Sequence, residues 1–273
     1  MKELTGGCRV YSSEDGQIST HGTWRSRSVI SSASGAKRIT QTVSEYSQGA
    51  SPYVTNPTAE EVLYVIAGNG ACHITDAVYA MHPGVALFIP PGATYNIENS
   101  SPEPIRTVSA CCPEDPNRTI SNHPANHRES KVGQAPSPAA DAPVGPIKGS
   151  QRPAGSSLSI HEQDREAIPA GKDRLFRILV HTDLGCKQIT QFVGWIPTSK
   201  APVHYHEYEE GIYILEGSGV IHTDDADCEF GPGSSVYFPQ GVRHCVENPG
   251  NTTIKVLGAF YPSGSPGAAY EDH

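Results

Sequence analysis

The hydrophobic residues of this chain gather in short runs that are rich in β-branched and aromatic side chains. Turn signals such as GNG, GSG, PPG and PQG bound these runs, and long amphipathic helical patterns are hard to find. Short strands at regular spacing are typical of a β-sandwich or β-barrel, and a small barrel can hold one ligand in its mouth. We therefore expect an all-β protein. The expected strands include residues 38–43, 62–68, 86–90, 188–195, 211–217, 235–239 and 253–261.

The same series of runs occurs twice along the chain. Residues 37–41 (KRITQ) return as residues 187–191 (KQITQ), an offset of 150. Residues 83–99 return as residues 232–248 at an offset of 149, and a single one-residue gap reconciles the two shifts. Because chance similarity rarely keeps one offset over dozens of residues, we interpret this as an internal duplication. Two copies of one unit are expected to adopt one fold twice and to pack together.

The stretch between the two copies has a different composition. Residues 113–155 are rich in Pro, Ala, Ser and Gly and show no apolar periodicity. Such a segment is predicted to be a linker. The sequence thus predicts a first domain over residues 1–112 and a second domain over residues 156–273.

Composition and charge exclude several classes of function. The chain has 273 residues, a formal net charge of −9, a pI of about 5.7 and no basic run. Phosphate surfaces select for clustered Lys and Arg, so neither a nucleic acid nor an anionic membrane is expected as a partner. No apolar run approaches the roughly 18 residues of a membrane span. Seven scattered Cys without a C-x-x-C pair are typical of reduced thiols, and we expect a soluble, cytoplasmic protein.

Candidate metal ligands gather in the second copy. His204 and His206 lie two residues apart and Glu210 keeps the same parity, so on a strand all three side chains point to one face. His244 follows on what should be a neighbouring strand. Three imidazoles and a carboxylate form a mixed N/O donor set that suits Fe, Mn, Ni, Co or Cu and leaves positions open for a substrate. The alternative is a set of solvated strand residues, which a single His-x-His would favour.

Around these residues the sequence resembles the two signature motifs of the cupin superfamily. The first motif usually begins with a Gly where this chain has Thr198, a departure that affects a turn and not a ligand. Because both halves carry the repeat, the chain is similar to a bicupin. The resemblance implies two tandem jelly-roll barrels joined by a Pro/Ala/Gly-rich linker, with one metal held by His204, His206, Glu210 and His244. The motifs read His204-x-His206-x3-Glu210-x6-Gly217 and Gly233-x5-Pro239-x-Gly241-x2-His244-x3-Asn248.

The first copy lacks most of this donor set. Where the second copy has three histidines, the first has Thr55, Pro57 and Tyr95, and only Glu61 keeps its carboxylate. Pro has no side chain that binds metal and Thr is a poor ligand, so we expect this half to be metal-free. Its expected roles are to pair with the second barrel and to close the substrate mouth. The alternative is a separate small-molecule pocket lined by Tyr64, Phe88 and Tyr95.

Several charged residues beside the motifs are expected on the surface. Glu207 and Glu209 have the opposite parity to the ligands, so we expect both to face solvent. His73 and His222 occupy equivalent positions in the two copies, and one copy lacks the metal ligands, so we interpret both as surface histidines. The same interpretation applies to Arg243, although an inward-turning bulge would let it hold an anionic substrate.

One fold hosts many reactions, so three functions stay open. The first is an oxygen-dependent dioxygenase of an enolisable or phenolic compound, similar in ligand pattern to quercetin-type and diketone-type cupin dioxygenases. Its divalent metal would be Fe or Mn first, with Ni and Co as alternatives, and Glu210 would be a catalytic base. The second is a redox-neutral hydrolase or isomerase resembling ureidoglycine aminohydrolase, and the third is a non-enzymatic binder of small molecules. We favour the dioxygenase because the ligand set departs from the aminohydrolase pattern. A small-molecule substrate and a homodimer are the expected partners.

Overall fold

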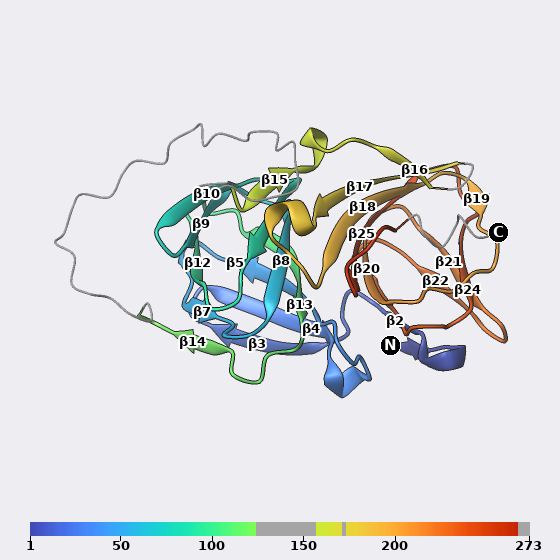
Figure 1. The fold of residues 1–273 in the computed structure, drawn as a ribbon, viewed down its shortest axis with the longest axis horizontal. Helices are drawn as coiled ribbons and strands as arrows, with labels where there is room; N and C mark the ends of the chain where they lie inside the picture. Colours follow the sequence, from blue (N-terminus) through green and yellow to red (C-terminus); the bar gives the residue numbers. More distant parts are fainter. Residues whose placement is uncertain (124–156, 171–172, 267–273) are drawn as a thin grey trace.

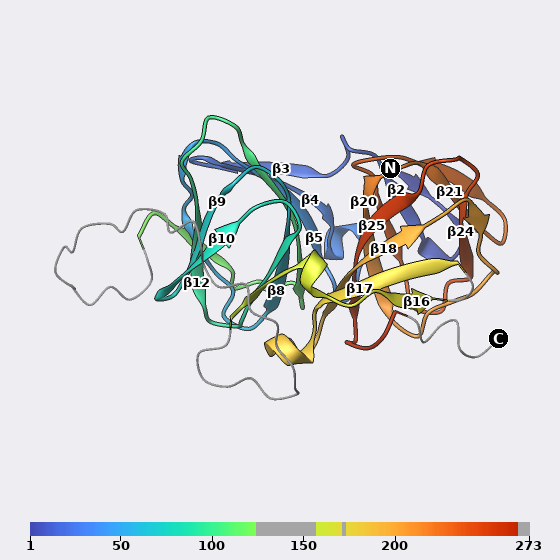
Figure 2. The same ribbon diagram turned by 90° about the horizontal axis from the view of Figure 1, so that it is seen from above.

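The structure is a computed structural model that describes residues 1–123, 157–170 and 173–266. These residues form strands and four short 3-10 helices, and Figures 1 and 2 show the strands arranged as two barrels side by side. The prediction of an all-β fold with two tandem jelly-roll barrels is confirmed. Most of the expected linker, residues 124–155, lies outside the described residues.

Two sheets form the first barrel. The larger sheet has the order β15 (Ser159–His161), β11 (Val85–Ile89), β8 (Glu60–Ala67), β13 (Ile105–Cys112), β5 (Gln41–Tyr46), β4 (Trp24–Ile30) and β3 (Gln17–His21). The smaller sheet has the order β10 (Ala77–Met81), β9 (Gly70–Ile74), β12 (Thr94–Asn99), β7 (Tyr53–Thr55) and β14 (Thr119–Ser121), and β6 (Gly49–Ala50) also pairs with β12.

The second barrel repeats this plan. Its larger sheet has the order β1 (Lys2–Glu3), β2 (Arg9–Tyr11), β23 (Ser235–Phe238), β20 (Glu209–Glu216), β25 (Ile254–Tyr261), β18 (Thr190–Ile196), β17 (Arg174–Val180) and β16 (Ile168–Ala170). Its smaller sheet has the order β19 (Ser199–Lys200), β24 (His244–Asn248), β21 (Gly219–Thr223) and β22 (Asp227–Phe230). The 3-10 helices are η1 (Thr5–Gly7), η2 (Ser32–Ser34), η3 (Glu162–Asp164) and η4 (Thr182–Leu184).

The strand pairing does not follow the domain boundaries expected from the sequence. β2, near the N-terminus, pairs with β23 of the second barrel, and β15, which follows the expected linker, pairs with β11 of the first. β14 lies inside the expected linker yet pairs with β7. Without these partners β23 and β11 would each present an open edge, which exposes unpaired backbone N–H and C=O groups. The two halves therefore complete each other's sheets.

The central strands are buried on both faces because the barrels pack against each other. The first six residues of β8 are all buried, as are the first four of β20. One apolar cluster joins side chains of both barrels, among them Val62 and Leu63 from the first and Val193 and Leu257 from the second. A strand that is covered on both faces reads as a continuous apolar run, which is the pattern of these two segments.

A pair of carboxylates links the two barrels reciprocally. Glu209 accepts backbone hydrogen bonds from Lys37 (3.1 Å), Arg38 (3.1 Å) and Ile39 (3.0 Å) of the first barrel. The equivalent Glu60 accepts backbone hydrogen bonds from residues 187 and 188 of the second barrel, the shortest at 2.7 Å. The expectation that Glu209 faces solvent is therefore wrong. Its side chain does point away from that of Glu210, but that face of β20 is covered by the other barrel.

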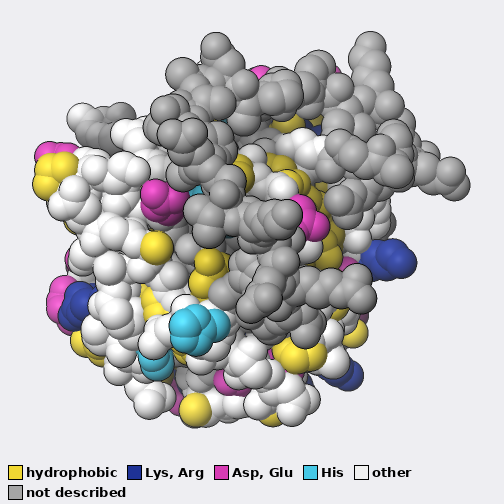
Figure 3. Space-filling view, turned by 90° about the vertical axis from the view of Figure 1, so that its left-hand side faces the viewer, with side chains coloured by type: hydrophobic (Ala, Val, Ile, Leu, Met, Phe, Trp, Pro, Cys, Tyr) yellow, Lys and Arg dark blue, Asp and Glu magenta, His cyan; other side chains and the backbone are white. Residues whose placement is uncertain are grey.

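The surface of the first barrel carries no concentration of charge on the part visible in Figure 3. There the side chains of Lys, Arg, Asp and Glu are scattered among uncharged atoms, with one basic and one acidic side chain side by side at the left edge. Among the described residues, no helix has the length and apolar character needed to cross a membrane.

Candidate metal centre

The backbone of the second barrel brings the histidine motifs together. His204 and His244 are directly opposite each other, and each backbone N–H donates to the other's carbonyl at 3.0 and 2.8 Å. The carbonyl of His206 accepts from the N–H of Gly241 (2.8 Å), whose φ of +77° places it in the left-handed region. Glycine adopts that conformation without strain. The turn before β24 thus holds His244 against the His-x-His segment.

The three histidines form one buried cluster. Their ligand atoms all lie within 4.8 Å of one another, and their exposed fractions are 5%, 7% and 2% for His204, His206 and His244. The ring centroids of His204 and His244 are 4.6 Å apart. Three imidazole nitrogens at such spacing, enclosed in a barrel, are the donor set that Zn, Cu, Fe, Co and Ni bind.

Hydrogen bonds fix two of the three rings in the tautomer that binds metal. The Nδ1 atom of His204 lies 2.9 Å from the carbonyl of Pro202, and that of His244 lies 2.8 Å from the carbonyl of Val242. A carbonyl only accepts, so in the neutral ring Nδ1 carries the proton and Nε2 does not, which is the tautomer that binds a metal through Nε2. Burial lowers the pKa of His204, and it lowers the pKa of His244 well below 6.5. Both rings are therefore neutral at pH 7.

Glu210 lies beside the histidine cluster. Its Oε2 is 3.1 Å from Nδ1 of His206, and the side chain is 4% exposed. The cluster defined by the 4.8 Å spacing contains the three histidines only. The contact is not aligned as a hydrogen bond, because Nδ1 of His206 has no hydrogen-bond partner among the described residues. Glu210 has two roles open to it: a fourth metal ligand, or a charged neighbour that positions His206. The sequence-based assignment of Glu210 as a ligand stays a prediction.

Aromatic side chains pack against the histidine rings. Phe238 stacks on His244 with centroids 4.0 Å apart, and Tyr208 stacks on His206 at 4.5 Å. Phe260 in turn stacks on Tyr208 at 4.2 Å. These contacts restrict ring rotation and exclude water from one side of the cluster. Sequence analysis did not assign a role to any of the three, although Phe238 directly precedes the Pro239 of the second motif.

A small cavity of about 90 Å³ adjoins the cluster. Its walls are mainly apolar, and one cation, Arg174, lines it with an exposed fraction of only 8%. The Nη2 group of Arg174 donates to the carbonyl of Val246 at 2.8 Å. Sequence analysis missed Arg174. The available signal was its position two residues before Phe176 on β17. On a strand, both side chains then point to the same face of the sheet. Other lining residues are Phe176, Phe192, Ile212, Phe238 and Val256.

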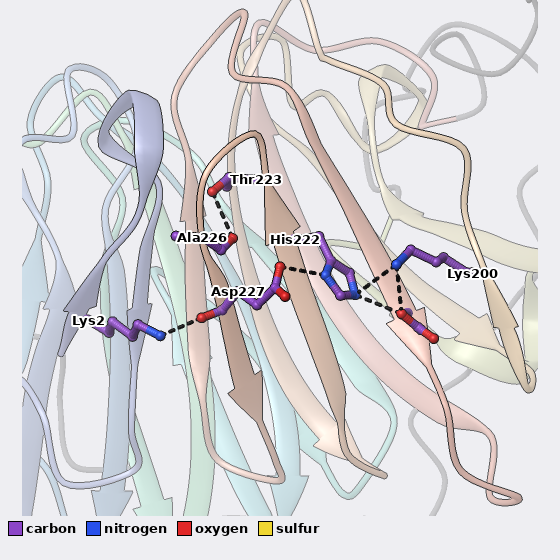
Figure 4. A network of polar contacts seen from close by, with 7 residues as sticks. Lys2, Lys200, His222, Thr223, Ala226 and Asp227 are labelled. Carbon is purple, nitrogen blue, oxygen red and sulfur yellow. Dashed lines mark hydrogen bonds and ion pairs between the residues drawn. The ribbon is translucent and has the colours of Figure 1, made fainter.

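The remaining predicted surface residues lie away from the cluster. Figure 4 shows His222 between Asp227 and a second carboxylate, that of Glu247, at 2.6 and 2.7 Å, with Lys200 beside them. His73 contacts Glu98 at 3.1 Å on the outside of the first barrel. Arg243 is 60% exposed and contacts Asp224. The expected surface positions of these residues, and of the exposed Glu207, are confirmed.

The corresponding region of the first barrel has a different set of contacts. The carboxylate of Glu61 accepts hydrogen bonds from Asn56 (2.7 Å) and from the hydroxyl of Tyr95 (3.0 Å), the residue in the place of His244. Thr55 contacts the Thr94 hydroxyl at 2.7 Å. Arg118, which sequence analysis did not single out, approaches Glu61 at 3.7 Å.

Comparison with known proteins agrees with this geometry. The sequence pattern of the cupin domain matches residues 43–111 and 192–260. The chain belongs to the cupin family. Because the pattern matches once in each barrel, the protein is a bicupin, as the sequence motifs had indicated.

Individual relatives fit the same picture. The bicupin is 40% identical over 91 residues to an uncharacterised protein of Methanocaldococcus jannaschii, covering 32% of this chain and 73% of that protein. It is 39% identical over 62 residues to an oxalate-binding protein of Thermotoga maritima, covering 22% of this chain and 51% of that protein.

Solved structures share the fold over nearly the whole chain. Oxalate decarboxylase from Bacillus subtilis superposes with a TM-score of 0.71 at 16% identity, covering 94% of this chain and 78% of that one. The putative glyoxylate-induced protein from Pseudomonas aeruginosa superposes with a TM-score of 0.68 at 19% identity, covering 95% and 91%. At these identities the likeness concerns the fold alone.

Proposed function

We propose that the second barrel is the catalytic centre of a metal-dependent enzyme that acts on a small organic acid. The observation that carries the proposal is the buried cluster of His204, His206 and His244, two of whose rings donate through Nδ1 to a backbone carbonyl. A divalent transition metal, Fe or Mn first and Ni or Co as alternatives, would supply Lewis acidity and redox chemistry at this cluster. Glu210 is the proposed fourth ligand.

The size and lining of the cavity support a small acid as the substrate. Its volume of about 90 Å³ is well below the ~300–1,000 Å³ of pockets for drug-sized ligands, which argues against a large phenolic compound. The planar fork of a guanidinium matches a carboxylate in two parallel hydrogen bonds, so Arg174 suits an acid group. The names of the oxalate-binding protein and of oxalate decarboxylase agree with a substrate of this class.

The residues of the chain would bind and orient this acid. Arg174 pairs with a carboxylate at one end of the cavity, and the apolar walls exclude water, which strengthens that ion pair in a low dielectric. Tyr208 and Phe238 hold the histidine rings in place. Glu210, buried at 4% exposure, is the only carboxylate among the residues that line the described cavity, so it is the proposed base for an enolisable proton.

Oxygen-dependent cleavage is the favoured reaction, and a redox-neutral reaction is the alternative. The test combines elemental analysis of the purified protein with turnover of oxalate, oxaloacetate and acetoacetate in air and without oxygen. We expect stoichiometric metal and oxygen-dependent loss of an enolisable acid. Equal turnover without oxygen, with solvent oxygen in the product, would support the redox-neutral alternative. Absence of bound metal after growth with each candidate ion would contradict the proposed function as a whole.

Substitution of Glu210 distinguishes a catalytic base from a residue that only orients His206. Glu210→Gln keeps an acceptor for His206 but removes the base. If Glu210 is a base, Glu210→Gln should lose activity as fully as Glu210→Ala. If it only orients His206, Glu210→Gln should retain most of the activity while Glu210→Ala loses metal.

A further inference from the structure

The first barrel holds a second cavity, of about 260 Å³, against β3, β4 and β5. This volume equals that of about nine water molecules at ~30 Å³ each. In contrast to the apolar cavity of the second barrel, its lining is mainly polar. Hydroxyl and amide groups line it together with two carboxylates, those of Glu114 and Asp115; the uncharged polar groups come from Gln17, Ser19, Ser26, Ser28, Thr42 and Asn56. The pocket expected from the sequence had a different lining, and the hydroxyl of Tyr64 instead donates to Glu162 at 2.6 Å.

A cation lies at this cavity, beside the residues that correspond to metal ligands. Nη2 of Arg118 is 3.7 Å from Oε1 of Glu61 and 3.4 Å from the hydroxyl of Tyr95. These two residues occupy the places of Glu210 and His244 in the repeat. The guanidinium lies over the ring of Trp24 at 5.6 Å and lines the cavity with 24% of its side chain exposed. The first barrel thus has a fixed cation of its own where the second has histidines.

Buried acceptors beside Arg118 lack donors. Asn56 is 1% exposed, and its Oδ1 has no hydrogen-bond partner among the described residues, although its Nδ2 donates to Glu61. Oε1 of Glu61, which lies behind the lining, likewise has no hydrogen bond there and is 3.7 Å from Nη2 of Arg118. Buried polar groups are nearly always hydrogen-bonded, so a buried acceptor on a polar cavity points to a ligand or water that donates to it.

Arg118 has N–H groups left that could donate to an oxyanion. An arginine offers five N–H groups, and the contacts to Glu61 and Tyr95 both use Nη2, while Nη1 meets the Cys111 sulfur at 3.8 Å. The nearby Asp115 does not compete for them. Its Oδ2 accepts from Thr58 N (2.8 Å), Thr58 Oγ1 (3.0 Å) and Ala59 N (3.2 Å).

We propose that the first barrel binds a small molecule carrying both an oxyanion and a hydroxyl, of the class of short 2-hydroxy acids, without a metal. Arg118 binds the oxyanion through two N–H groups, and the ligand's hydroxyl donates to Oδ1 of Asn56. The hydroxyl groups of β4 and β5 complete the shell. The two barrels then bind acids by different means: the second through a metal and Arg174, the first through Arg118 alone.

Tryptophan fluorescence can test this site separately from the second barrel. The chain has two tryptophans, so Trp195→Phe leaves Trp24, which lies under Arg118, as the sole reporter. Chelator-treated Trp195→Phe protein is titrated with glycolate, the simplest 2-hydroxy acid. We expect a saturable change in emission, with acetate roughly tenfold weaker because it lacks the hydroxyl, and no saturable change with ethylene glycol.

Variants decide whether Arg118 is the binding group. In the Trp195→Phe background, Arg118→Lys keeps the charge but loses the fork, and should weaken glycolate binding at least about tenfold. Arg118→Met combined with Glu61→Gln removes both members of the buried pair together and should abolish binding. His204→Ala, in the other barrel, is the matched control and should leave the glycolate affinity unchanged, which separates this site from the proposed catalytic function.

Three results would overturn the proposal. They are the absence of a saturable glycolate signal in folded protein, unchanged affinity in Arg118→Lys, and loss of the signal in His204→Ala. Circular dichroism and thermal unfolding establish folding for each variant. If the double variant does not fold, the affinity of Arg118→Lys decides.

Discussion

Replacing Glu209 by Gln should weaken the junction between the two barrels. The carboxylate is 6% exposed and accepts backbone hydrogen bonds from Lys37, Arg38 and Ile39 at 3.0 to 3.1 Å. Hydrogen bonds to charged groups contribute about 1.5–3 kcal/mol each, against about 1 kcal/mol for neutral pairs. Glutamine keeps one acceptor oxygen but loses the charge, and its amide N–H₂ faces backbone donors. We therefore expect a loss of about 2–3 kcal/mol in the free energy of unfolding.

Thermal and urea unfolding of the metal-free protein measure this loss. One kcal/mol corresponds to a Tm shift of roughly 2–4 °C in a chain of about this size, so Glu209→Gln should lower Tm by roughly 4–12 °C. Glu207→Gln is the matched control, because Glu207 is exposed and should change stability by less than about 0.5 kcal/mol. Glu60→Gln should behave as Glu209→Gln does. A Glu209→Gln variant as stable as the control would refute the reasoning.

Further predictions concern the second barrel. Elemental analysis of the full chain should find one metal per chain, and His204→Ala should remove it; a full complement of metal in His204→Ala would place the site elsewhere. His206→Ala and His244→Ala should also lose metal and activity. Circular dichroism should show the fold intact in both variants, because apolar burial stabilises the barrel. Unfolding at room temperature would instead mean that the metal is structural. Burial lowers the pKa of His204 and His244, so metal should stay bound somewhat below pH 6.5. The metal-free protein should lose stability as pH falls through 6.5, because the unfolded chain then takes up protons more readily than the folded chain does. Arg174→Lys should raise KM more than it lowers kcat for an acid substrate; an unchanged KM would exclude Arg174 from binding.

The strand exchange makes each barrel depend on the other half of the chain. The first barrel includes β15 and the second includes β1 and β2. Cutting the chain in the linker and separating the two halves would therefore leave open edges on β11 and β23. Substitutions in the full chain keep both edges paired, so metal content and stability are best measured on the whole protein.

The fold and the histidine cluster could be predicted from the sequence because both depend on local spacing. Short β-branched and aromatic runs bounded by turn signals indicate strands, and a repeat at nearly one offset indicates two copies of one unit. The resemblance to the cupin motifs implies that each unit is a jelly-roll barrel. His204 and His206 share a face because a strand has a period of two. The pairing of His204 with His244 followed from the motif order and needed no knowledge of the loops between them.

Other features depend on which surfaces meet, and local spacing does not report that. Arg174 is the first residue of an apolar strand and reads as an ordinary cation at a strand end, yet the barrel wall closes over it. Arg118 lies in a segment rich in polar and turn residues, and only the pairing of β14 with β7 brings it to Glu61. The strand exchange was equally hidden, because residues 2–11 and 159–161 carry no signal that names a partner strand.

The two Glu-Glu pairs of the repeat show that strand parity predicts the direction of a side chain but not what surrounds it. Glu209 and Glu210 do point to opposite faces of β20, and so do Glu60 and Glu61 on β8. The outer member of each pair reaches the other barrel and accepts from equivalent backbone N–H groups, those of residues 37 and 38 for Glu209 and of residues 187 and 188 for Glu60. The inner members differ: Glu210 lies beside three histidines, and Glu61 lies beside Arg118. The duplication therefore kept the carboxylate that holds the barrels together and changed the partners of the one inside. The proposed metal ion in one barrel and the arginine in the other would then solve the same physical problem, that of placing a cation beside a buried carboxylate.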